Sequence, residues 1–434
     1  MTNRIPRREF LAWAGLAGGA ALLPARLALA RAGSGNARFV LVIMRGALDG
    51  LAAVPPCGDR DYAALRREFA LHAPGGAGGA LPLDGFFGLH PALRFLQQCY
   101  AARELTVLHA LATPYRERSH FDGQDVLENG SARAHALQSG WLNRALAAAP
   151  GPGRREAGVA LAQSVPLVMR GPAPVTSWSP SKLAGADDDT LARLTDLYAG
   201  DALLSQRLAD ALAADAMAAA DLSDGGMPRG NAAPAAGPAN TANTANTANT
   251  ANTTSTANTA RPGQQYRELV HAAAGFLREE DGPRVAVFDT TGWDTHANEG
   301  GAEGQLAGRL AALDGGLATL RSELGAVWGD TAVLLVTEFG RTAAINGTRG
   351  TDHGTATAAF LLGGAVAGGR VVADWPGLSQ RALYQGRDLR PTLDLRSVLK
   401  GILGEHLAVP TRALDRDVFP DSGAVRPLRG LMRA

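Results

Sequence analysis

The chain has 434 residues, and its 42 basic and 41 acidic side chains give it a formal net charge of +1. Residues 1–30 carry four arginines and one glutamate, so the remaining chain has 38 basic and 40 acidic side chains. A chain this close to neutral has no electrostatic basis for binding nucleic acid or an anionic membrane. It is long enough to build a core without disulfides, so we expect Cys57 and Cys99 to be small buried residues, with one disulfide after export as the alternative.

The first 30 residues predict a twin-arginine signal peptide. The motif Arg7-Arg8-Glu9-Phe10-Leu11 precedes a short apolar run, and Ala28-Leu29-Ala30 forms a small-x-small cleavage site. The apolar run is too short and too weakly hydrophobic for a retained membrane anchor. We therefore expect a soluble periplasmic or secreted protein without stable membrane insertion, which the twin-arginine translocase exports in its folded state.

Short apolar runs that alternate with helical stretches predict one α/β domain over residues 31–434. Such alternation favours a mostly parallel sheet with helices on both faces. In the helix expected at 304–328, leucines recur at alternating spacings of four and three, which predicts a crossover helix covering one face of the sheet. The expected strands are 40–44, 105–111, 166–169, 285–288, 332–337 and 359–362.

The composition changes in the middle of the chain. Residues 190–220 are rich in alanine and leucine and predict a helix. Residues 223–262 lose this apolar content and include five Ala-Asn-Thr repeats between 239 and 253. Such a tract cannot bury enough surface to order itself, so we expect a disordered insertion that interrupts the domain.

Side chains that bind divalent cations follow several of the predicted strands. Asp294 and His296 lie two residues apart just after strand 285–288, so in extended backbone they point to the same side. Because the carboxyl ends of parallel strands meet at one sheet edge, we predict a metal site there, rather than separate salt bridges or helix caps. The candidate ligands are Asp49, Asp294, His296, Glu338, Asp352 and His353. This set does not choose between zinc, manganese, calcium and magnesium, nor between one ion and two.

Ser119 falls at or near the N-cap of a helix expected over residues 121–127. One interpretation is that its hydroxyl only caps the helix. The functional interpretation makes it a nucleophile, because the helix dipole, Arg118 and a nearby cation would lower the hydroxyl pKa and hold an anionic substrate. The two roles are compatible.

Five motifs occur in order across nearly all of the mature chain outside the insertion, namely Arg45-Gly46-Ala47-Leu48-Asp49-Gly50, Arg118-Ser119-His120-Phe121, Gly292-Trp293-Asp294-Thr295-His296, Thr337-Glu338-Phe339-Gly340-Arg341-Thr342 and Gly350-Thr351-Asp352-His353-Gly354. Taken together, these motifs resemble the DUF1501 family of uncharacterised bacterial proteins. That family in turn resembles, more distantly, the alkaline phosphatase and sulfatase superfamily. The resemblance implies an alkaline-phosphatase-like parallel sheet with a metal centre at its carboxyl edge and a nucleophile that opens a helix.

The resemblance also implies a role for individual residues. Asp49 would be the first-strand ligand and Ser119 the nucleophile, whereas the remaining ligands would be Asp294, His296, Glu338 and His353. One position departs from the superfamily, because Phe339 stands where an imidazole is usual. Either Asp352 replaces it, or the centre holds one metal and Arg341 neutralises charge. The sulfatase motif Cys/Ser-x-Pro-x-Arg does not occur in the sequence, which counts against sulfatase activity itself.

From these features we expect a metal-dependent hydrolase of small phosphate or sulfate esters. The reaction would form a covalent Ser119 intermediate, with Arg118 or Arg341 binding the oxygens of the transferred group. The alternative is a non-catalytic periplasmic binding or assembly protein on a degenerate hydrolase fold. Phe339 motivates this alternative, because loss of one metal site can abolish turnover and leave a binding pocket.

Overall fold

The computed structural model describes residues 36–76, 78–151, 157–180, 188–202, 204–206, 208–209, 211–212 and 262–433. Its centre is a nine-stranded sheet in the order β10-β4-β9-β8-β1-β7-β5-β6, with β11 also pairing with β4. The strands are β1 (Arg38–Arg45), β4 (Leu105–Ala112), β5 (Gly158–Leu161), β6 (Val175–Trp178), β7 (Val285–Thr291), β8 (Thr331–Val336), β9 (Thr357–Leu362), β10 (Arg370–Val372) and β11 (Leu393–Asp394). A separate small sheet pairs β2 (Leu81–Pro82) with β3 (Gly88–Leu89).

The sheet is mixed but mostly parallel. Strand β9 runs antiparallel to both of its neighbours, β4 and β8, and the other pairs in this sheet are parallel. Strand β1 lies at its centre, where Phe39 pairs with Val285 of β7 and with Ala332 of β8. Because β1 is covered on both faces, its sequence reads as a continuous apolar run rather than as an alternating one.

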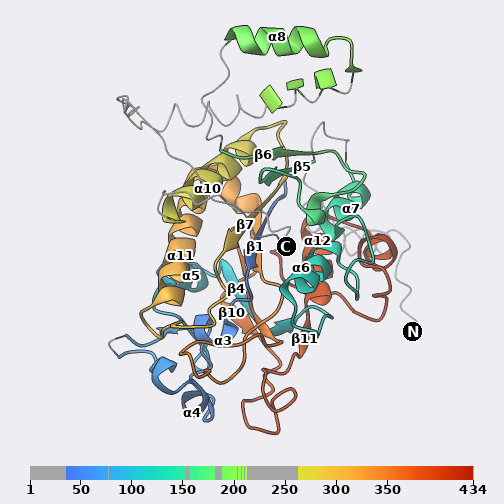
Figure 1. The fold of residues 1–434 in the computed structure, drawn as a ribbon. Coiled ribbons are helices and arrows are strands. Elements are labelled where there is room, and N and C mark those ends of the chain that lie inside the picture. The colour runs from blue at the N-terminus through green and yellow to red at the C-terminus, as the bar shows by residue number, and fades with distance from the viewer. Residues whose placement is uncertain are drawn as a thin grey trace, which may run out of the picture.

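Two apolar cores lie on opposite faces of the sheet. Alternate side chains of β1 divide between them, with Val40 in one core and Leu41 in the other. Helices α5 (Arg94–Ala101), α10 (Pro262–Arg278) and α11 (Gln305–Leu324) cover the first face, and α6 (His120–Asn129), α7 (Trp141–Ala148) and α12 (Leu395–His406) cover the second (Figure 1). The shorter helices are α3 (Gly50–Ala53), α4 (Tyr62–Arg66), α8 (Asp188–Tyr198) and α13 (Thr411–Ala413).

Most of the predicted elements are confirmed, including the crossover helix α11 between β7 and β8. The strand predicted at 166–169 is wrong, because Leu167–Met169 forms a short 3-10 helix. The Val168 N–H donates to Glu128 Oε2 at 3.0 Å, and the Met169 carbonyl accepts from Asn143 Nδ2 at 2.8 Å. Side chains of α6 and α7 therefore satisfy the backbone groups that a strand would pair with its neighbour.

Two predictions fall largely outside the described residues, namely the signal peptide at 1–30 and nearly all of the insertion at 223–262. Helix α8 forms the start of the helix predicted at 190–220. Cys57 and Cys99 are free thiols. In the part of the chain that the structure describes, none of the helices combines the length and apolar character needed to cross a membrane.

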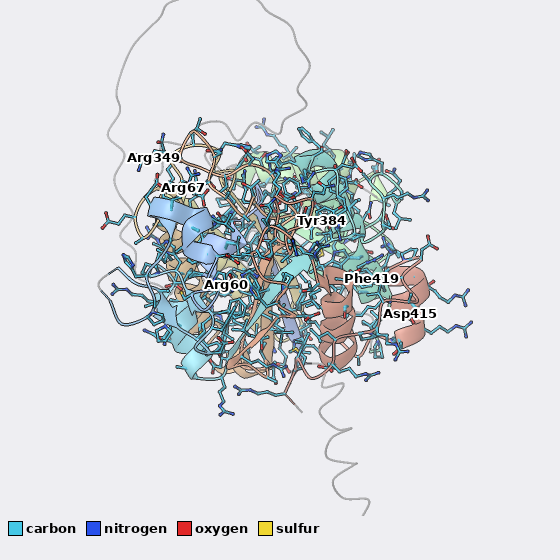
Figure 2. The ribbon with its side chains drawn as sticks, turned by 90° about the horizontal axis from the view of Figure 1, so that it is seen from below. Arg60, Arg67, Arg349, Tyr384, Asp415 and Phe419 are labelled. Atoms are coloured by element: carbon cyan, nitrogen blue, oxygen red, sulfur yellow. The ribbon has the colours of Figure 1, made fainter. Side chains whose placement is uncertain are left out.

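The carboxyl ends of β1, β7 and β8 lead into the segments that carry the predicted site residues. The turn after β1 contains Asp49, the segment after β7 contains Asp294, and the segment after β8 contains Glu338. Figure 2 shows the molecule from this end, where Arg349 comes from the segment between β8 and β9. The fold thus gathers segments that lie far apart in sequence at one edge of the sheet, as the strand pattern predicts.

Candidate metal centre

Three imidazoles and one carboxylate meet at this edge. His120 is the first residue of α6, Asp294 and His296 follow β7, and His353 lies between β8 and β9. Nε2 of His353 is 2.9 Å from Nε2 of His120 and 2.9 Å from Nε2 of His296. Oδ1 of Asp294 lies 3.1 Å from Nε2 of His296, and 3.5 Å from Nε2 of each of the other two histidines. These four side chains are called the imidazole cluster below.

The spacing within the imidazole cluster suits one metal ion. Zinc binds imidazole nitrogen and carboxylate oxygen at about 2.0–2.2 Å, so neighbouring ligand atoms of a tetrahedral site lie about 3.3–3.6 Å apart. The separations of 2.9 to 3.5 Å are close to this value. Among the described residues, His120, Asp294 and His353 form a group whose ligand atoms all lie within 4.8 Å of one another. His296 then adds a fourth donor that reaches two members of this group.

Each imidazole of the cluster has an oxygen acceptor at Nδ1. The acceptors are Glu338 Oε1 at 2.7 Å from His120, the Arg118 carbonyl at 2.9 Å from His353 and Asp352 Oδ1 at 3.4 Å from His296. An acceptor at Nδ1 holds the ring proton there and leaves a lone pair on Nε2, as is usual for metal-binding histidines. Two such lone pairs 2.9 Å apart repel each other unless a cation or a proton lies between them. The ring orientations therefore fit a bound divalent cation.

The electrostatics of the cluster favour positive charge. Burial would lower the pKa of His120, but its hydrogen bonds with Asp294 and Glu338 raise that pKa to about 9. Burial would raise the pKa of Asp294, but hydrogen bonds from His120, His353 and Arg341 hold it well below its usual range. A group of side chains that keeps a proton on an imidazole at neutral pH also attracts a divalent cation, which competes with that proton.

One side of the cluster is open to solvent. The side chains of Asp294 and His296 are 44% and 45% exposed, whereas those of His120 and His353 are 21% and 27% exposed. A metal held here would be anchored from the protein side by two half-buried imidazoles and would face water on the other side. Catalytic metal sites keep such an accessible position, whereas structural zinc sites are closed by protein ligands.

A family model described as "Protein of unknown function (DUF1501)" matches residues 108–417, a range that contains the whole imidazole cluster. The chain belongs to the DUF1501 family. A comparison with the curated proteins finds no match.

Asp49 has a different environment in this DUF1501 protein from the one predicted. Its side chain is buried, caps α3 by accepting from Leu51 N at 3.0 Å and Ala52 N at 3.1 Å, and forms a two-point ion pair with Arg66. Burial would raise the pKa of Asp49, but Arg66 lowers it below its usual value. The structure does not bring Asp49 into the imidazole cluster, because a guanidinium already neutralises this carboxylate.

Glu338 and Asp352 lie next to the cluster as orienting groups. Glu338 is fully buried, and its carboxylate accepts from His120, from Gly46 N at 2.9 Å and from Thr337 Oγ1 at 2.8 Å. Burial would raise the pKa of Glu338, but these hydrogen bonds lower it. Asp352 contacts the Nδ1 atom of His296 from the solvent side. Both carboxylates therefore face the Nδ1 side of an imidazole, opposite the Nε2 atoms that converge.

The guanidinium of Arg341 is fully engaged by the protein. It donates to the carbonyls of Gly46 and Ala47 at 2.9 Å each, to those of Trp293 and Thr351, and to the Asp294 carboxylate. With 1% of its surface exposed, it joins the turn after β1 to the segment after β7. Arg341 thus neutralises Asp294, as the one-metal alternative requires, but offers little surface to a substrate.

Arg118 is also held by protein groups. Its guanidinium lies 2.8 Å from Asp388 and donates to Gln385 at 2.6 Å, while its carbonyl orients His353. The predicted role for Arg118 was to bind substrate oxygens with its side chain. In the structure, the group of Arg118 that reaches the cluster is its peptide carbonyl.

Ser119 occupies the predicted N-cap position of α6, immediately before His120. Its backbone is extended, as expected for an N-cap, but its side chain makes no capping hydrogen bond. The hydroxyl is partly exposed and contacts the phenol of Tyr115. Capping therefore does not account for Ser119.

His120 is the cluster member that the strand-end pattern misses. It lies at the start of a helix rather than just after a strand, so the strand-end pattern that predicts Asp294 and His353 does not include it. The signal was its position beside Ser119 in the motif Arg118-Ser119-His120-Phe121. A helix N-terminus that already has a candidate nucleophile is a reasonable place to look for a ligand as well.

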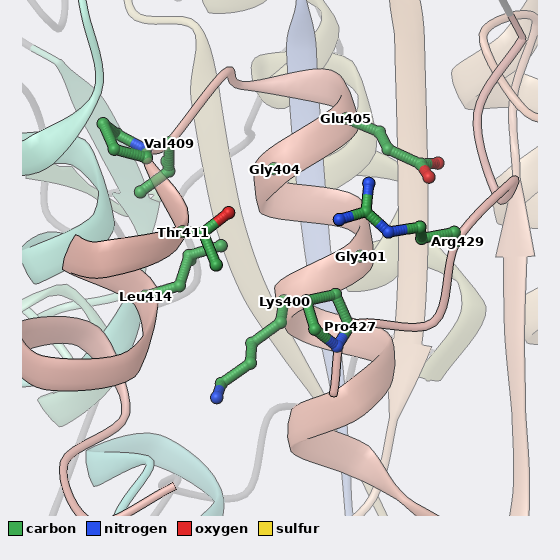
Figure 3. A pocket seen from close by; sticks show the side chains of 10 residues that line it. Lys400, Gly401, Gly404, Glu405, Val409, Thr411, Leu414, Pro427 and Arg429 are labelled. Carbon is green, nitrogen blue, oxygen red and sulfur yellow. The ribbon is translucent and has the colours of Figure 1, made fainter. Parts of the chain in front are cut away.

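A surface pocket elsewhere carries no comparable chemistry. It lies along α12 and is lined by Lys400, Glu405 and Arg429 among others, none of them members of the imidazole cluster (Figure 3). The Lys400 ammonium group is satisfied by Asp415 at 2.5 Å and by the carbonyls of Ser422 and Val425. We therefore place the functional site at the imidazole cluster rather than in this pocket.

Proposed function

We propose that this protein is a metal-dependent hydrolase of phosphate or sulfate esters, with one divalent cation held by the imidazole cluster. The observation that carries the proposal is the convergence of the Nε2 atoms of His120 and His353 with Asp294 Oδ1, with His296 Nε2 within 3.1 Å of the last two and an oxygen acceptor behind each ring. The motif resemblance to the alkaline phosphatase and sulfatase superfamily supports the same reaction class. Three imidazoles and one carboxylate favour zinc over calcium or magnesium, which prefer oxygen ligands.

A single ion suits the site better than two. The carboxylate that would have served a second ion, Asp49, is paired with Arg66 instead. The Arg66 guanidinium thus already supplies the positive charge that a second cation would bring to Asp49.

Ser119 is the proposed nucleophile. Its Oγ atom would form a bond to the phosphorus or sulfur of the ester, the leaving alcohol would depart with a proton, and water would then hydrolyse the covalent intermediate. A bound cation would lower the pKa of the attacking hydroxyl and stabilise charge on the transferred group. The Ser119 hydroxyl is not used as a helix cap and Ser119 directly precedes His120, and both facts support this role.

A specific observation also favours the non-catalytic alternative. Four protein ligands can complete a tetrahedral zinc site, and both arginines expected to bind substrate are committed to protein acceptors. A binding or assembly protein could use such a centre to hold its loops in place. The half-exposed Asp294 and His296 favour the enzyme, because a closed structural site would be buried.

Metal analysis tests the centre itself. Protein purified without chelator should contain about one zinc per chain, whereas the His353→Ala variant should contain almost none. The matched control is His72→Ala, which removes an exposed histidine outside the cluster. Equal and negligible metal in all three proteins would end the proposal.

The same proteins then test the reaction. Aryl phosphates, phosphodiesters and aryl sulfates should be compared with wild type and Ser119→Ala at equal metal content. Turnover by wild type that Ser119→Ala abolishes supports the enzyme and its nucleophile. Full metal content without turnover of any ester would favour the binding protein.

We also propose export by the twin-arginine route, on the basis of the Arg7-Arg8 motif. Replacing both residues by lysine should retain the full-length protein in the cytoplasm, as cell fractionation would show. Unchanged export of the double variant would contradict this proposal.

A further inference from the structure

Asp388 is a buried carboxylate that contacts two of the segments carrying the imidazole cluster. Its side chain is fully buried, and one carboxylate oxygen, Oδ2, accepts a hydrogen bond from each of the two segments. The donors are Arg118 Nε at 2.9 Å, from the segment before α6, and Thr355 Oγ1 at 2.8 Å, from the segment before β9. These residues lie two positions before His120 and two positions after His353. One carboxylate thus joins the two segments at the level of the cluster.

Arg118 links this carboxylate to His353. Its φ angle is 61°, in the left-handed region that residues other than glycine and asparagine rarely adopt. In this conformation the Arg118 carbonyl accepts from His353 Nδ1 at 2.9 Å. A backbone strained in this way persists only when its surroundings fix it. The ion pair of the Arg118 guanidinium with Asp388 is a contact that does so.

A second arginine connects Asp388 to the backbone of His353. Arg387 Nε lies 3.5 Å from Asp388 Oδ1, and another nitrogen of the same guanidinium donates to the His353 carbonyl. His353 is therefore held through its ring by the Arg118 carbonyl and through its main chain by Arg387. Asp388 binds the Arg118 guanidinium by hydrogen bond and lies within ion-pair distance of Arg387, so one buried charge contacts both the residue whose carbonyl accepts from the His353 ring and the residue that donates to the His353 carbonyl.

We propose that Asp388 is the positioning residue of the metal centre, and that it sets the separation of the His120 and His353 imidazoles through Arg118, Thr355 and Arg387. This inference rests on the proposed metal centre and goes beyond it, because Asp388 is neither a ligand nor in contact with one through its own side chain. It also assigns Arg118 a role, since that residue acts on the cluster through its carbonyl and not by binding substrate.

The rival explanation is that Asp388 only stabilises the fold. A purely structural role predicts that variants lose stability and bind metal normally once folded. A positioning role predicts weaker metal binding and a changed coordination geometry in folded protein. Groups that orient metal ligands typically contribute about 10- to 100-fold to metal affinity. For Asp388, which acts through a second residue, we expect about a tenfold loss.

The experiment compares three single variants of the full mature chain. Asp388→Asn removes the charge and keeps the shape. Arg118→Asn removes the guanidinium but keeps the carbonyl, and asparagine tolerates a positive φ. Asp415→Asn is the matched control, because it breaks an ion pair to the buried Lys400 on α12, away from the cluster. Zinc affinity is measured by competition with a chromophoric chelator, and the visible spectrum of the cobalt(II)-loaded protein reports the coordination geometry.

We expect Asp388→Asn and Arg118→Asn each to weaken zinc binding about tenfold and to change the cobalt spectrum. The double variant should be no weaker than Asp388→Asn alone, because the Arg118 guanidinium acts through a contact that Asp388→Asn already disrupts. Asp415→Asn should leave both readouts unchanged. Wild-type affinity and spectrum in folded Asp388→Asn and Arg118→Asn would overturn the inference while leaving the metal centre intact. Failure of wild type to bind zinc or cobalt would instead overturn the proposed function.

Discussion

Two groups of acidic side chains lie at the carboxyl edge of this sheet, and they balance their charge differently. In the first, Asp49 and Glu299 are buried beside Arg66, and we call these three residues the arginine cluster. In the second, the imidazole cluster, the Nε2 atoms of three histidines lie around Asp294 Oδ1. Each carboxylate has an arginine, since Arg66 pairs with Asp49 and Arg341 with Asp294. Only Asp294 also faces imidazoles, and we propose that these bind a cation.

The difference shows that one sheet edge can hold both a fully enclosed ion pair and a partly exposed group of imidazoles. The arginine cluster is fully enclosed, and the Thr351 hydroxyl donates to Glu299 at 2.7 Å, which connects it to the segment that carries His353. The imidazole cluster is half exposed. A permanently paired carboxylate cannot exchange ligands, but it can hold the backbone from which exchangeable ligands project. The following predictions separate the two roles.

The largest effect is expected in the arginine cluster. Arg66→Met should destabilise the protein by about 3–5 kcal/mol, because it leaves the Asp49 charge buried without a partner. Zinc content of the folded fraction should stay the same. Chemical denaturation and elemental analysis of one preparation would provide both values. Loss of zinc at full stability would instead place Asp49 at the metal.

Removing a proposed ligand should weaken zinc binding and leave stability nearly unchanged. His353→Ala should weaken zinc binding by about 100-fold or more, since a ligand contributes more than a group that merely orients one. The stability of the metal-free protein should change little, because the imidazole is partly exposed. Isothermal titration and denaturation without metal would separate the two quantities. A destabilised variant with normal zinc affinity would be inconsistent with ligation.

Glu338→Gln should weaken zinc binding less than His353→Ala does and more than Arg66→Met does. The amide retains an acceptor for the His120 ring but loses the negative charge behind it, so zinc affinity should fall by about 10- to 100-fold. Thr337→Val is a useful control, because it removes only a hydroxyl that donates to Glu338. A complete loss of zinc in Glu338→Gln would indicate that Glu338 binds the metal directly.

The arginine cluster should also have a distinctive pH dependence. Burial and the neighbouring Asp49 raise the pKa of Glu299 well above its ordinary value. A raised folded-state pKa contributes stability that is complete below the unfolded pKa of about 4.5 and is lost as pH rises through the folded pKa. Wild type should therefore lose stability relative to Glu299→Gln by about 1.4 kcal/mol per pH unit across that interval. Melting temperatures measured from pH 5 upward would reveal this, and parallel curves would contradict it.

The sequence predicts the longer strands of the main sheet, because their burial produces long apolar runs, as in β1 and β8. It misses the strands of two to four residues, β5, β6, β10 and β11, which are too short to give such a run. It fails at 166–169, where an apolar run is buried by helices and bonded to Glu128 and Asn143. The strand pattern also predicts that the candidate ligands lie at one edge of the sheet. Their individual roles depend on partners that no local pattern reveals.

The candidate site illustrates this limit. Asp49 and Asp294 look equivalent in sequence, since each follows a strand of the central sheet. Their difference comes from Arg66, which the α4 segment brings onto Asp49, and from His120 and His353, which approach Asp294. These contacts join residues that are far apart along the chain. Only the packed structure tells a carboxylate enclosed with its arginine from one that also faces imidazoles.

The smallest effect on stability is expected for Ser119→Ala. A side chain that caps a helix contributes about 0.5–2 kcal/mol, but the Ser119 hydroxyl makes no capping hydrogen bond. We therefore expect a loss below about 0.5 kcal/mol. Asp394→Ala is the matched control, because Asp394 caps α12 by accepting from Arg396 N at 2.8 Å, and it should lose about 1 kcal/mol. Denaturation midpoints of both variants would provide the comparison. If Ser119→Ala loses as much stability as Asp394→Ala, the Ser119 hydroxyl stabilises the helix. Unchanged stability together with lost ester hydrolysis would assign the hydroxyl to the reaction.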